Sequence, residues 1–444
     1  MIERQMQSRP YLPPDEVCAH VPEEFPLVFL GGGGRYCVLA TEYSRVAPET
    51  MFERFVQQTK TTPFADLPFL TGYIGALSYD SRVKHWLGEE GAPDIVYRIY
   101  GALCFDRITG KLWHVREPSD GHRPQFQLDV DRLLHKTEQQ GKLSRQDYPE
   151  VQLLPLATDQ NYLRRVRCAL ADIKQGRYYQ INLLRYFHGN PAPTRRGWLR
   201  RMGALGGPYS GMIETGKVRI VSFSPERFLA LTPSSWGVQI KAAPIKGTMG
   251  RDSDPAVDRH LRRRLTASPK DRAELSMIVD LMRNDLHSVC EPQTVKVTDP
   301  GSVRSYATVH HLEAKIRGRL RNGLTMGELL QSVCPGGSIT GAPKKEVVQA
   351  IRQYEGRQRG YFMGHFFAWD QAGQFNSSIL IRTAVHERNL PYVTYGAGSG
   401  IVIHSSPEQE MAEVSTKCRV ITEAGYSSTG DFENRLMSVQ TGAP

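Results

Sequence analysis

The stretch YVTYGAGSGIVIHSSPEQEMAEVSTK, residues 392–417, joins a strand pattern directly to a helix start. Residues 392–403 favour a strand, yet Gly396, Gly398 and Gly400 occupy alternate positions in it. Glycine inside a strand indicates a bulge or the close approach of a backbone or a ligand. A helix is then expected from Ser406 and Pro407, because proline in the first turn of a helix loses no hydrogen bond. This stretch predicts a chain of mixed α and β structure.

Strand and helix patterns continue on the N-terminal side of this stretch. Helices are expected to begin at Asp159, Ser268 and Pro343. Short apolar and β-branched runs predict strands at 178–187, 218–223, 228–231, 238–242, 361–369 and 379–385. A polar stretch at 137–159 divides the chain into an N-terminal region, 1–150, a second region, 151–423, and a flexible tail, 424–444.

The composition excludes several classes of protein. The 444 residues include 40% hydrophobic and 23% charged residues, which is typical of globular chains. No apolar run approaches the roughly 20 residues that span a membrane. Residues 1–16 show no export or import pattern, so a cytoplasmic protein is expected. Seven cysteines without a C-x-x-C pair argue against disulfides and zinc, and are expected to be reduced packing residues.

The net charge of +10 suits either nucleic acid or small anionic substrates. The densest basic clusters, 164–167 and 259–264, lie in helix-like segments without interleaved aromatic residues. Such clusters are typical of solvated helix faces. A non-catalytic chain associated with nucleic acid is therefore the weaker alternative.

Carboxylates are concentrated in the first turns of two expected helices. Asp271 and Glu274 follow Ser268, and Glu410 and Glu413 follow Ser406. Acids are common at such positions because the helix dipole favours them. The alternative is a magnesium site, since Mg²⁺ binds one or two carboxylates and lets an anionic substrate complete its coordination.

Three further segments allow a functional and an ordinary interpretation. The glycine-rich segment CPGGSITGAPKK, 334–345, lacks the Lys-Ser/Thr of a nucleotide-binding loop, but its backbone N–H groups could bind a carboxylate beside Thr340. Arg382 lies in the apolar run ILIRTAV and either pairs with a carboxylate or points to water. Lys246, in APIKGT, is either a surface lysine or a nucleophile whose pKa burial or a nearby cation must lower.

These segments together resemble one family. VSFSPERF, APIKGT, ELSMIVDLMRNDL, VHHLEAKIRGRL, CPGGSITGAPK, ILIRTAV and AGSGIVIHSSPEQEMAEVSTK occur in the order found in chorismate-utilising enzymes. The resemblance is dense over about 158–422 and looser in FLTGYIGALSYD, near residue 75. It implies a large α/β (α+β) fold in which two antiparallel sheets form a core flanked by helices, with the active site in a cleft.

The resemblance also implies a role for individual residues. Glu226 would be the general acid that protonates the departing C4 hydroxyl of chorismate, and His311 would lie in the pocket. Magnesium would be held by Glu274 and Glu413, with Asp271 and Glu410 beside them. Arg382 would hold the enolpyruvyl carboxylate. The remaining substrate-binding positions would be Thr248, Thr340, Gly341, Gly398, Gly400 and Lys417.

Two positions discriminate within the family. Lys246 matches the PIKGT motif of aminodeoxychorismate synthases, where anthranilate synthases have alanine. Gln180 stands where isochorismate and salicylate synthases have a lysine that activates water, so ammonia is the expected nucleophile. Amination to 4-amino-4-deoxychorismate, the precursor of p-aminobenzoate and folate, is therefore expected, and anthranilate synthesis is the alternative. The chain has no G-x-C-x-G amidotransferase segment, so a separate glutamine amidotransferase subunit is expected to supply the ammonia.

Overall fold

The computed structural model describes residues 5–31, 34–56, 69, 71–117, 123–140, 150–306 and 309–422. Helices run over Pro14–Ala19 (α1), Glu49–Phe52 (α2), Tyr79–Leu87 (α3), Val130–Gln140 (α4), Asp159–Lys174 (α5), Arg195–Leu205 (α6), Pro255–Ala267 (α7), Pro269–His287 (α8), Met326–Val333 (α9), Lys344–Glu355 (α10) and Pro407–Thr422 (α11), with a 3₁₀ turn at Gly337–Ile339.

Strands alternate with these helices. They run over Gln5–Arg9 (β1), Val28–Leu30 (β2), Tyr36–Val46 (β3), Gly72–Leu77 (β4), Ile95–Asp106 (β5), Lys111–Arg116 (β6), Phe126–Gln127 (β7), Gln152–Pro155 (β8), Gln180–Asn190 (β9), Gly211–Glu214 (β10), Val218–Ser222 (β11), Arg227–Ser234 (β12), Gly237–Ala242 (β13), Ile245–Gly250 (β14), Lys296–Ser305 (β15), Val309–Arg319 (β16), Gly341–Ala342 (β17), His365–Asp370 (β18), Phe375–Ile379 (β19), Thr383–Glu387 (β20) and Val393–Val402 (β21).

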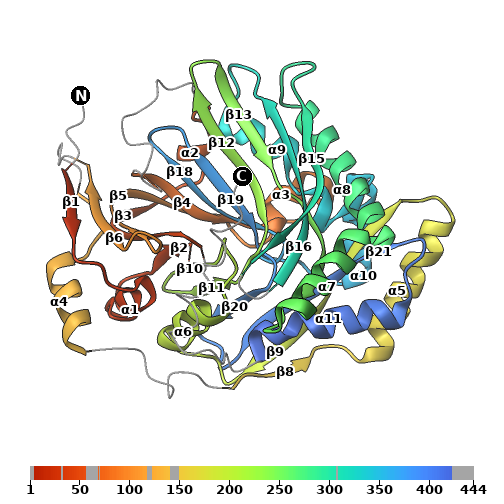
Figure 1. The fold of residues 1–444 in the computed structure, drawn as a ribbon, viewed down its shortest axis with the longest axis horizontal. Coiled ribbons are helices and arrows are strands. Elements are labelled where there is room, and N and C mark those ends of the chain that lie inside the picture. The colour runs from red at the N-terminus through yellow and green to blue at the C-terminus, as the bar shows by residue number, and fades with distance from the viewer. Residues whose placement is uncertain are drawn as a thin grey trace.

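The strands pair in antiparallel fashion, and hydrogen bonds connect them into one network. Strand β21 pairs with β9 over its whole length, and β16 pairs with β13, β14 and β15. Helices α5, α7, α8, α10 and α11 gather along one side of these strands, while α1 packs beside α6 near the N-terminal strands (Figure 1). The expected fold class, mixed α and β structure with an antiparallel core, is confirmed.

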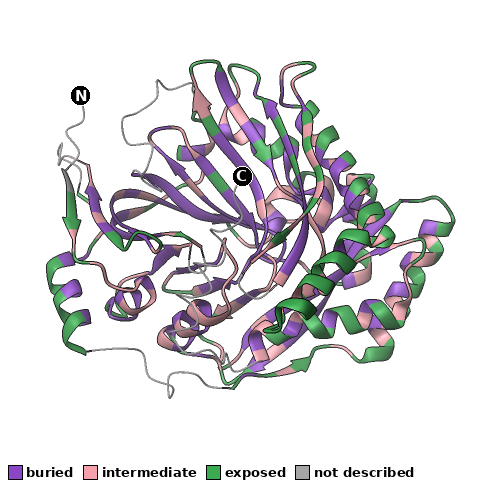
Figure 2. Cartoon of the chain, viewed as in Figure 1, coloured by how far each residue is buried: buried purple, intermediate pink, exposed green. Residues whose placement is uncertain are grey.

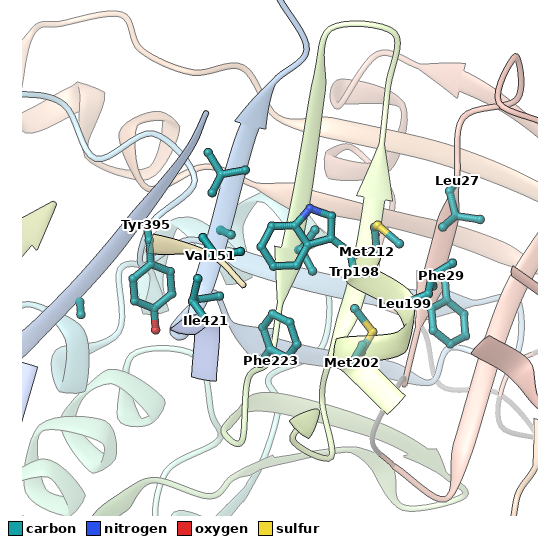
Figure 3. Close-up of a cluster of buried hydrophobic side chains, with 14 of the residues drawn as sticks. Leu27, Phe29, Val151, Trp198, Leu199, Met202, Met212, Phe223, Tyr395 and Ile421 are labelled. Atoms are coloured by element: carbon teal, nitrogen blue, oxygen red, sulfur yellow. The ribbon is translucent and has the colours of Figure 1, made fainter. Parts of the chain in front are cut away.

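The two regions on either side of residue 150 share strands and core. Strand β4 pairs with β18, and β2 pairs with β10. The hydrophobic cluster in Figure 3 combines Leu27 and Phe29 with Trp198, Phe223 and Ile421. The division of the chain at residue 150 stays a prediction, and the expected tail, 424–444, lies outside the described residues.

Burial follows the layers of the fold, with buried residues along the strands and exposed residues on the outer faces of the helices (Figure 2). Among the cysteines, all seven are free and six are buried, but Cys168 is exposed, so its interpretation as a packing residue is wrong. In the part of the chain that the structure describes, no helix is long and apolar enough to cross a membrane.

Three expected elements differ in detail. Helix α5 is capped by Thr158, whose side chain accepts a hydrogen bond from the Asn161 amide, one residue before the expected cap. Pro343 precedes α10 as its N-cap instead of lying inside it. The strand expected at 379–385 is broken between β19 and β20, because Arg382 has a left-handed backbone with φ of 51°.

The burial of Trp198 in the core leads to the first prediction. Trp198 is fully buried against Phe223, with ring centroids 6.1 Å apart, whereas Trp236 is 83% exposed. Trp198→Ala should lower the free energy of unfolding by about 3–5 kcal/mol, because it leaves a large cavity. Trp236→Ala should change it by less than about 0.5 kcal/mol. Urea denaturation followed by circular dichroism measures both, and equal losses would contradict the assigned core.

Candidate active site

Lys246 joins two elements that are distant in sequence. Its Nζ lies 2.7 Å from Oε2 of Glu274, so the ion pair connects β14 to the first turns of α8. The next residue, Gly247, has φ of +80°, and a Cβ there would lie 2.8 Å from Cγ of Asp271. Glycine therefore allows β14 to approach α8 closely, which brings Lys246 to Glu274.

The charge of Lys246 depends on three carboxylates. Burial by itself lowers the pKa of Lys246, but Glu274, Glu413 and Glu410 outweigh it and raise the pKa above its ordinary value. Helices α8 and α11 thus direct acids from their first two turns at one lysine. The interpretation of Lys246 as a solvated surface lysine is wrong, because its side chain is only 20% exposed.

Gly398 and Gly400 of β21 form one wall of the site, and Gly400 lies opposite Lys246. A Cβ on Gly400 would lie 3.5 Å from Nζ of Lys246 and 3.4 Å from Nε2 of Gln180. Gln180 belongs to the adjacent strand β9 and is buried, and neither its Oε1 nor its Nε2 has a hydrogen-bond partner among the residues that the structure describes. A buried amide without partners is costly unless a ligand or water satisfies it. The close-approach interpretation of these glycines is therefore supported.

Lys417 lies at the same wall. Its Nζ donates a hydrogen bond to the carbonyl oxygen of Gly398 at 2.7 Å and forms an ion pair of 2.7 Å with Glu413, one helical turn away. Burial raises the pKa of Glu413, but Lys417 and Lys246 outweigh this effect and lower it below its ordinary value. Two lysines therefore face the acids of α11.

Glu226 combines burial with nearby cations. It lies in the turn before β12, where its amide bonds the Ser224 hydroxyl at 3.3 Å, and it is only 7% exposed. Burial raises the pKa of Glu226 to about 7, against the opposing effects of Lys246, Lys417 and Arg382. A carboxyl group with this pKa can donate a proton near neutral pH.

His311 is buried on β16 and cannot be a cation at neutral pH. Burial, together with the charge of Arg382, lowers the pKa of His311 to about 3. Its Nδ1 lies 2.8 Å from the Thr248 hydroxyl, and its buried Nε2 has no partner in the described residues. The neutral ring is thus held by Thr248 with one nitrogen left for a ligand.

Arg382 occupies the break between β19 and β20. No hydrogen bond or ion pair of its guanidinium is found in the described part of the chain. Burial lowers the pKa of Arg382, and Tyr395 and Glu226 act in the opposite direction. Of the two interpretations of this arginine, pairing with a carboxylate of a bound ligand is the better supported.

The turn before α10 closes the site against β9. The Thr340 hydroxyl bonds the Gly336 carbonyl at 2.8 Å, and the Asn182 amide bonds the Thr340 carbonyl at 2.8 Å. Gly341 then pairs with Ile181, at φ of +136°, and any Cβ there would lie 1.9 Å from the Gln180 carbonyl oxygen. Only glycine permits this contact.

The carboxylates of α8 and α11 suit a hard cation such as Mg²⁺, but they are not gathered around one point. Among the residues described, no group of three or more histidine, cysteine, aspartate or glutamate side chains is gathered around one point. Glu274 and Glu413 are held by lysines, whereas Glu410 is 5% exposed and has no ion pair within the described ranges. Oxygen-only donors and an unpaired buried carboxylate suit Mg²⁺.

All the site residues expected from the sequence therefore lie around the β9 and β21 wall, and their roles stay predictions. A buried ion pair, Glu355 with Arg359, was not expected from the sequence, and it contacts both β9 and the residue before Thr340. The spacing of four residues could have indicated it. Gly356 ends α10 between the two residues, however, so the sequence shows no continuous helix face.

Comparison with known proteins gives a consistent result. The family model described as chorismate binding enzyme matches residues 34–423. The chain is 37% identical to aminodeoxychorismate synthase component 1 of Salmonella typhimurium, over 80% of this chain and 77% of that protein. It is 32% identical to the chloroplastic aminodeoxychorismate synthase of Arabidopsis thaliana, over 81% of this chain but only 41% of that longer protein.

The fold has a solved counterpart. Anthranilate synthase component I from Streptococcus pneumoniae superimposes with a TM-score of 0.72 and 22% identity, over 88% of this chain and 92% of that one. Enzymes named for two different products therefore resemble the chain, the aminodeoxychorismate synthases in sequence and the anthranilate synthase component in fold. Because the matching family model extends over most of its length, the chain belongs to the family of chorismate-binding enzymes.

Proposed function

We propose that this chain is the chorismate-aminating component of an aminodeoxychorismate synthase, which converts chorismate and ammonia to 4-amino-4-deoxychorismate and water. The observation that carries the proposal is Lys246, whose Nζ lies beside the glycine wall and the unpartnered amide of Gln180. An amine at this point can reach a ring held between the strands and α8. The identity to aminodeoxychorismate synthases adds support.

Lys246 acts first in the proposed mechanism. Its neutral amine attacks C2 of the ring, a C2–N bond forms, the ring double bond shifts, and the C4–O bond breaks. Glu226 gives its proton to the departing hydroxyl, which leaves as water. Because attack requires a neutral amine, the Lys246 ammonium must first release one proton to solvent and separate from Glu274.

Ammonia completes the reaction at C4. It forms the new C4–N bond, the double bond returns, and the C2–N bond to Lys246 breaks, which regenerates the amine. The ionised Glu226 takes up the proton that the added ammonia loses. Gln180 is proposed to orient ammonia, since neither end of its amide has a hydrogen-bond partner within the described ranges.

Magnesium is proposed as the cofactor. Held by Glu274 and Glu413, with Glu410 and Asp271 beside them, it would supply a divalent charge that binds the ring carboxylate of chorismate. Arg382 would hold the enolpyruvyl carboxylate, and Lys417 would add positive charge. Thr340, Gly341, Gly398 and Gly400 are proposed to line the pocket that holds the substrate.

A glutamine amidotransferase subunit is proposed as the source of ammonia. The chain itself contains no G-x-C-x-G nucleophile segment. The product would then serve as a precursor of p-aminobenzoate in folate synthesis. Anthranilate synthesis is the alternative outcome of the tests below.

Removal of the proposed nucleophile provides the second prediction. Lys246→Ala should lower ammonia-dependent formation of 4-amino-4-deoxychorismate by about 100-fold or more. Lys270→Ala is the matched control, because Lys270 also faces Glu274, at 3.9 Å, but is 66% exposed. Product is quantified by mass spectrometry, and an unchanged rate in Lys246→Ala would exclude the covalent step.

The pKa of Glu226 predicts the pH dependence. Glu226 must be protonated and Lys246 neutral in the reacting enzyme, and burial raises the pKa of Glu226 to about 7 while nearby carboxylates keep the pKa of Lys246 above its ordinary value. At a constant concentration of free ammonia, kcat/KM should therefore rise with pH as Lys246 loses its proton and level off above about pH 7, where Glu226 ionises. Glu226→Gln should lower the rate by about 10²–10⁴-fold and remove the levelling near pH 7. The same levelling in Glu226→Gln would assign it to another group.

Metal removal tests the acids of α11. Turnover should stop in EDTA and return with magnesium. Glu413→Gln should raise the magnesium concentration for half-maximal activity by at least about tenfold. Glu408→Gln should not, since Glu408 is 63% exposed and pairs with Arg167 on the outer face of α11. Full activity without metal would refute the magnesium site.

A further inference from the structure

Strand β9 has a gap in its pairing beside the candidate active site. On the edge away from β21, β17 pairs with Gln180 and Ile181, and β8 pairs with 187–190. The amide of Leu156 also bonds the Tyr186 carbonyl at 2.9 Å. Between them, in the described part of the chain, no strand pairs with β9 on this edge. Buried backbone groups there require other partners.

A buried ion pair provides those partners. Arg359 donates through Nη2 to the Asn182 carbonyl at 2.7 Å, and Glu355 Oε1 accepts from the Leu184 amide at 2.8 Å. The two side chains bond each other at 2.6 Å and are 1% and 0% exposed. Glu355 also accepts from the Tyr186 hydroxyl at 2.9 Å. The pair thus takes the place of a missing strand.

The same guanidinium also holds the turn that carries Thr340. Arg359 Nη1 donates to the Ile339 carbonyl at 3.0 Å, and Ile339 directly precedes Thr340. One planar group therefore fixes the distance between β9, which carries Gln180, and the turn that carries Thr340. The planar fork of arginine suits two carbonyls and a carboxylate at once, which a lysine ammonium cannot match.

The loop that carries Arg359 is itself anchored to the N-terminal region. Asp80, in the first turn of α3, accepts from the backbone amides of Arg359 at 3.1 Å and Gly360 at 3.0 Å. Gly356, with φ of +67°, reverses the chain after Glu355 so that Arg359 returns to it. Arg359 is therefore fixed both at its backbone, by Asp80, and at its guanidinium.

We propose that Arg359 and Glu355 are positioning residues that set the spacing between the Gln180 strand and the Thr340 turn, and so determine how tightly chorismate is bound. They would act through the backbone and would not touch the substrate. This inference rests on the proposed function only in naming chorismate as the ligand.

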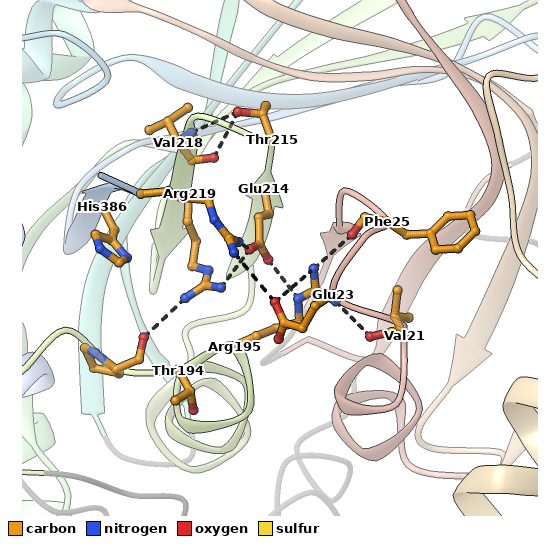
Figure 4. A network of polar contacts seen from close by, with 12 residues as sticks. Val21, Glu23, Phe25, Thr194, Arg195, Glu214, Thr215, Val218, Arg219 and His386 are labelled. Carbon is orange, nitrogen blue, oxygen red and sulfur yellow. Dashed lines mark hydrogen bonds and ion pairs between the residues drawn. The ribbon is translucent and has the colours of Figure 1, made fainter. Parts of the chain in front are cut away.

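A matched control exists in a distant part of the fold. Arg195 is 1% exposed, pairs with the buried Glu214 at 2.8 Å, and donates to the carbonyls of Val21 and Phe25 at 2.8 and 2.9 Å (Figure 4). Arg359→Lys and Arg195→Lys therefore remove the same kind of contact and should reduce stability similarly. Only Arg359→Lys should increase the mobility of the candidate active site.

The test compares the two variants by hydrogen–deuterium exchange of the ligand-free chain. Arg359→Lys should accelerate exchange about tenfold or more in peptides that contain 180–186 and 339–342. Arg195→Lys should leave these peptides at the wild-type rate and accelerate those near 21–25. Unchanged exchange at 180–186 in Arg359→Lys, or equal acceleration there in Arg195→Lys, would overturn the proposal.

Calorimetric titration with chorismate and magnesium gives the second measurement. Arg359→Lys should raise the Kd about tenfold, and Arg195→Lys should stay within about twofold of the wild type. An equal Kd in Arg359→Lys and wild type would refute the effect on binding. If the wild-type chain did not bind chorismate, the proposed function would fail, and the exchange measurement would still decide the positioning role.

Discussion

The antiparallel pairing of β9 with β21 is the constraint on which the site depends. The register runs from Val393 opposite Gly189 to Val402 opposite Gln180. Because directly opposed residues share a face, Gly398 and Gly400 lie on the same face as the even-numbered residues of β9. A slip of one residue would turn Gln180 away from the site. Leu184 fills the space beside Gly398, whereas Gly400 leaves a space that Lys246 partly occupies.

Burial produces opposite effects on the two ionisable groups that flank this wall. It raises the pKa of Glu226 to about 7 and lowers that of His311 to about 3. At neutral pH the His311 ring is therefore uncharged and about half of Glu226 is protonated, while Lys246, Lys417 and Arg382 lie around them. An anionic substrate suits such a site because it can pair with these cationic side chains.

The sequence predicted the elements and residues that depend on local patterns. Two Ser-Pro pairs, at 268–269 and 406–407, predicted the starts of α8 and α11. The alternate glycines predicted the close approach of a backbone or a ligand to their strand. Other features depend on tertiary contacts that no local pattern encodes. The break at Arg382 interrupts an apolar run that is otherwise typical of a strand. Glu355 and Arg359 are separated by a helix end, so their joint contact with β9 becomes apparent only in the folded chain.

Identification of the product decides whether this site aminates chorismate at C4. The purified chain is incubated with chorismate, magnesium and an ammonium salt at mildly alkaline pH, and the products are identified by mass. We expect a product in which an amino group replaces the C4 hydroxyl and the enolpyruvyl group is retained. Release of pyruvate with formation of anthranilate would exclude the proposed amination.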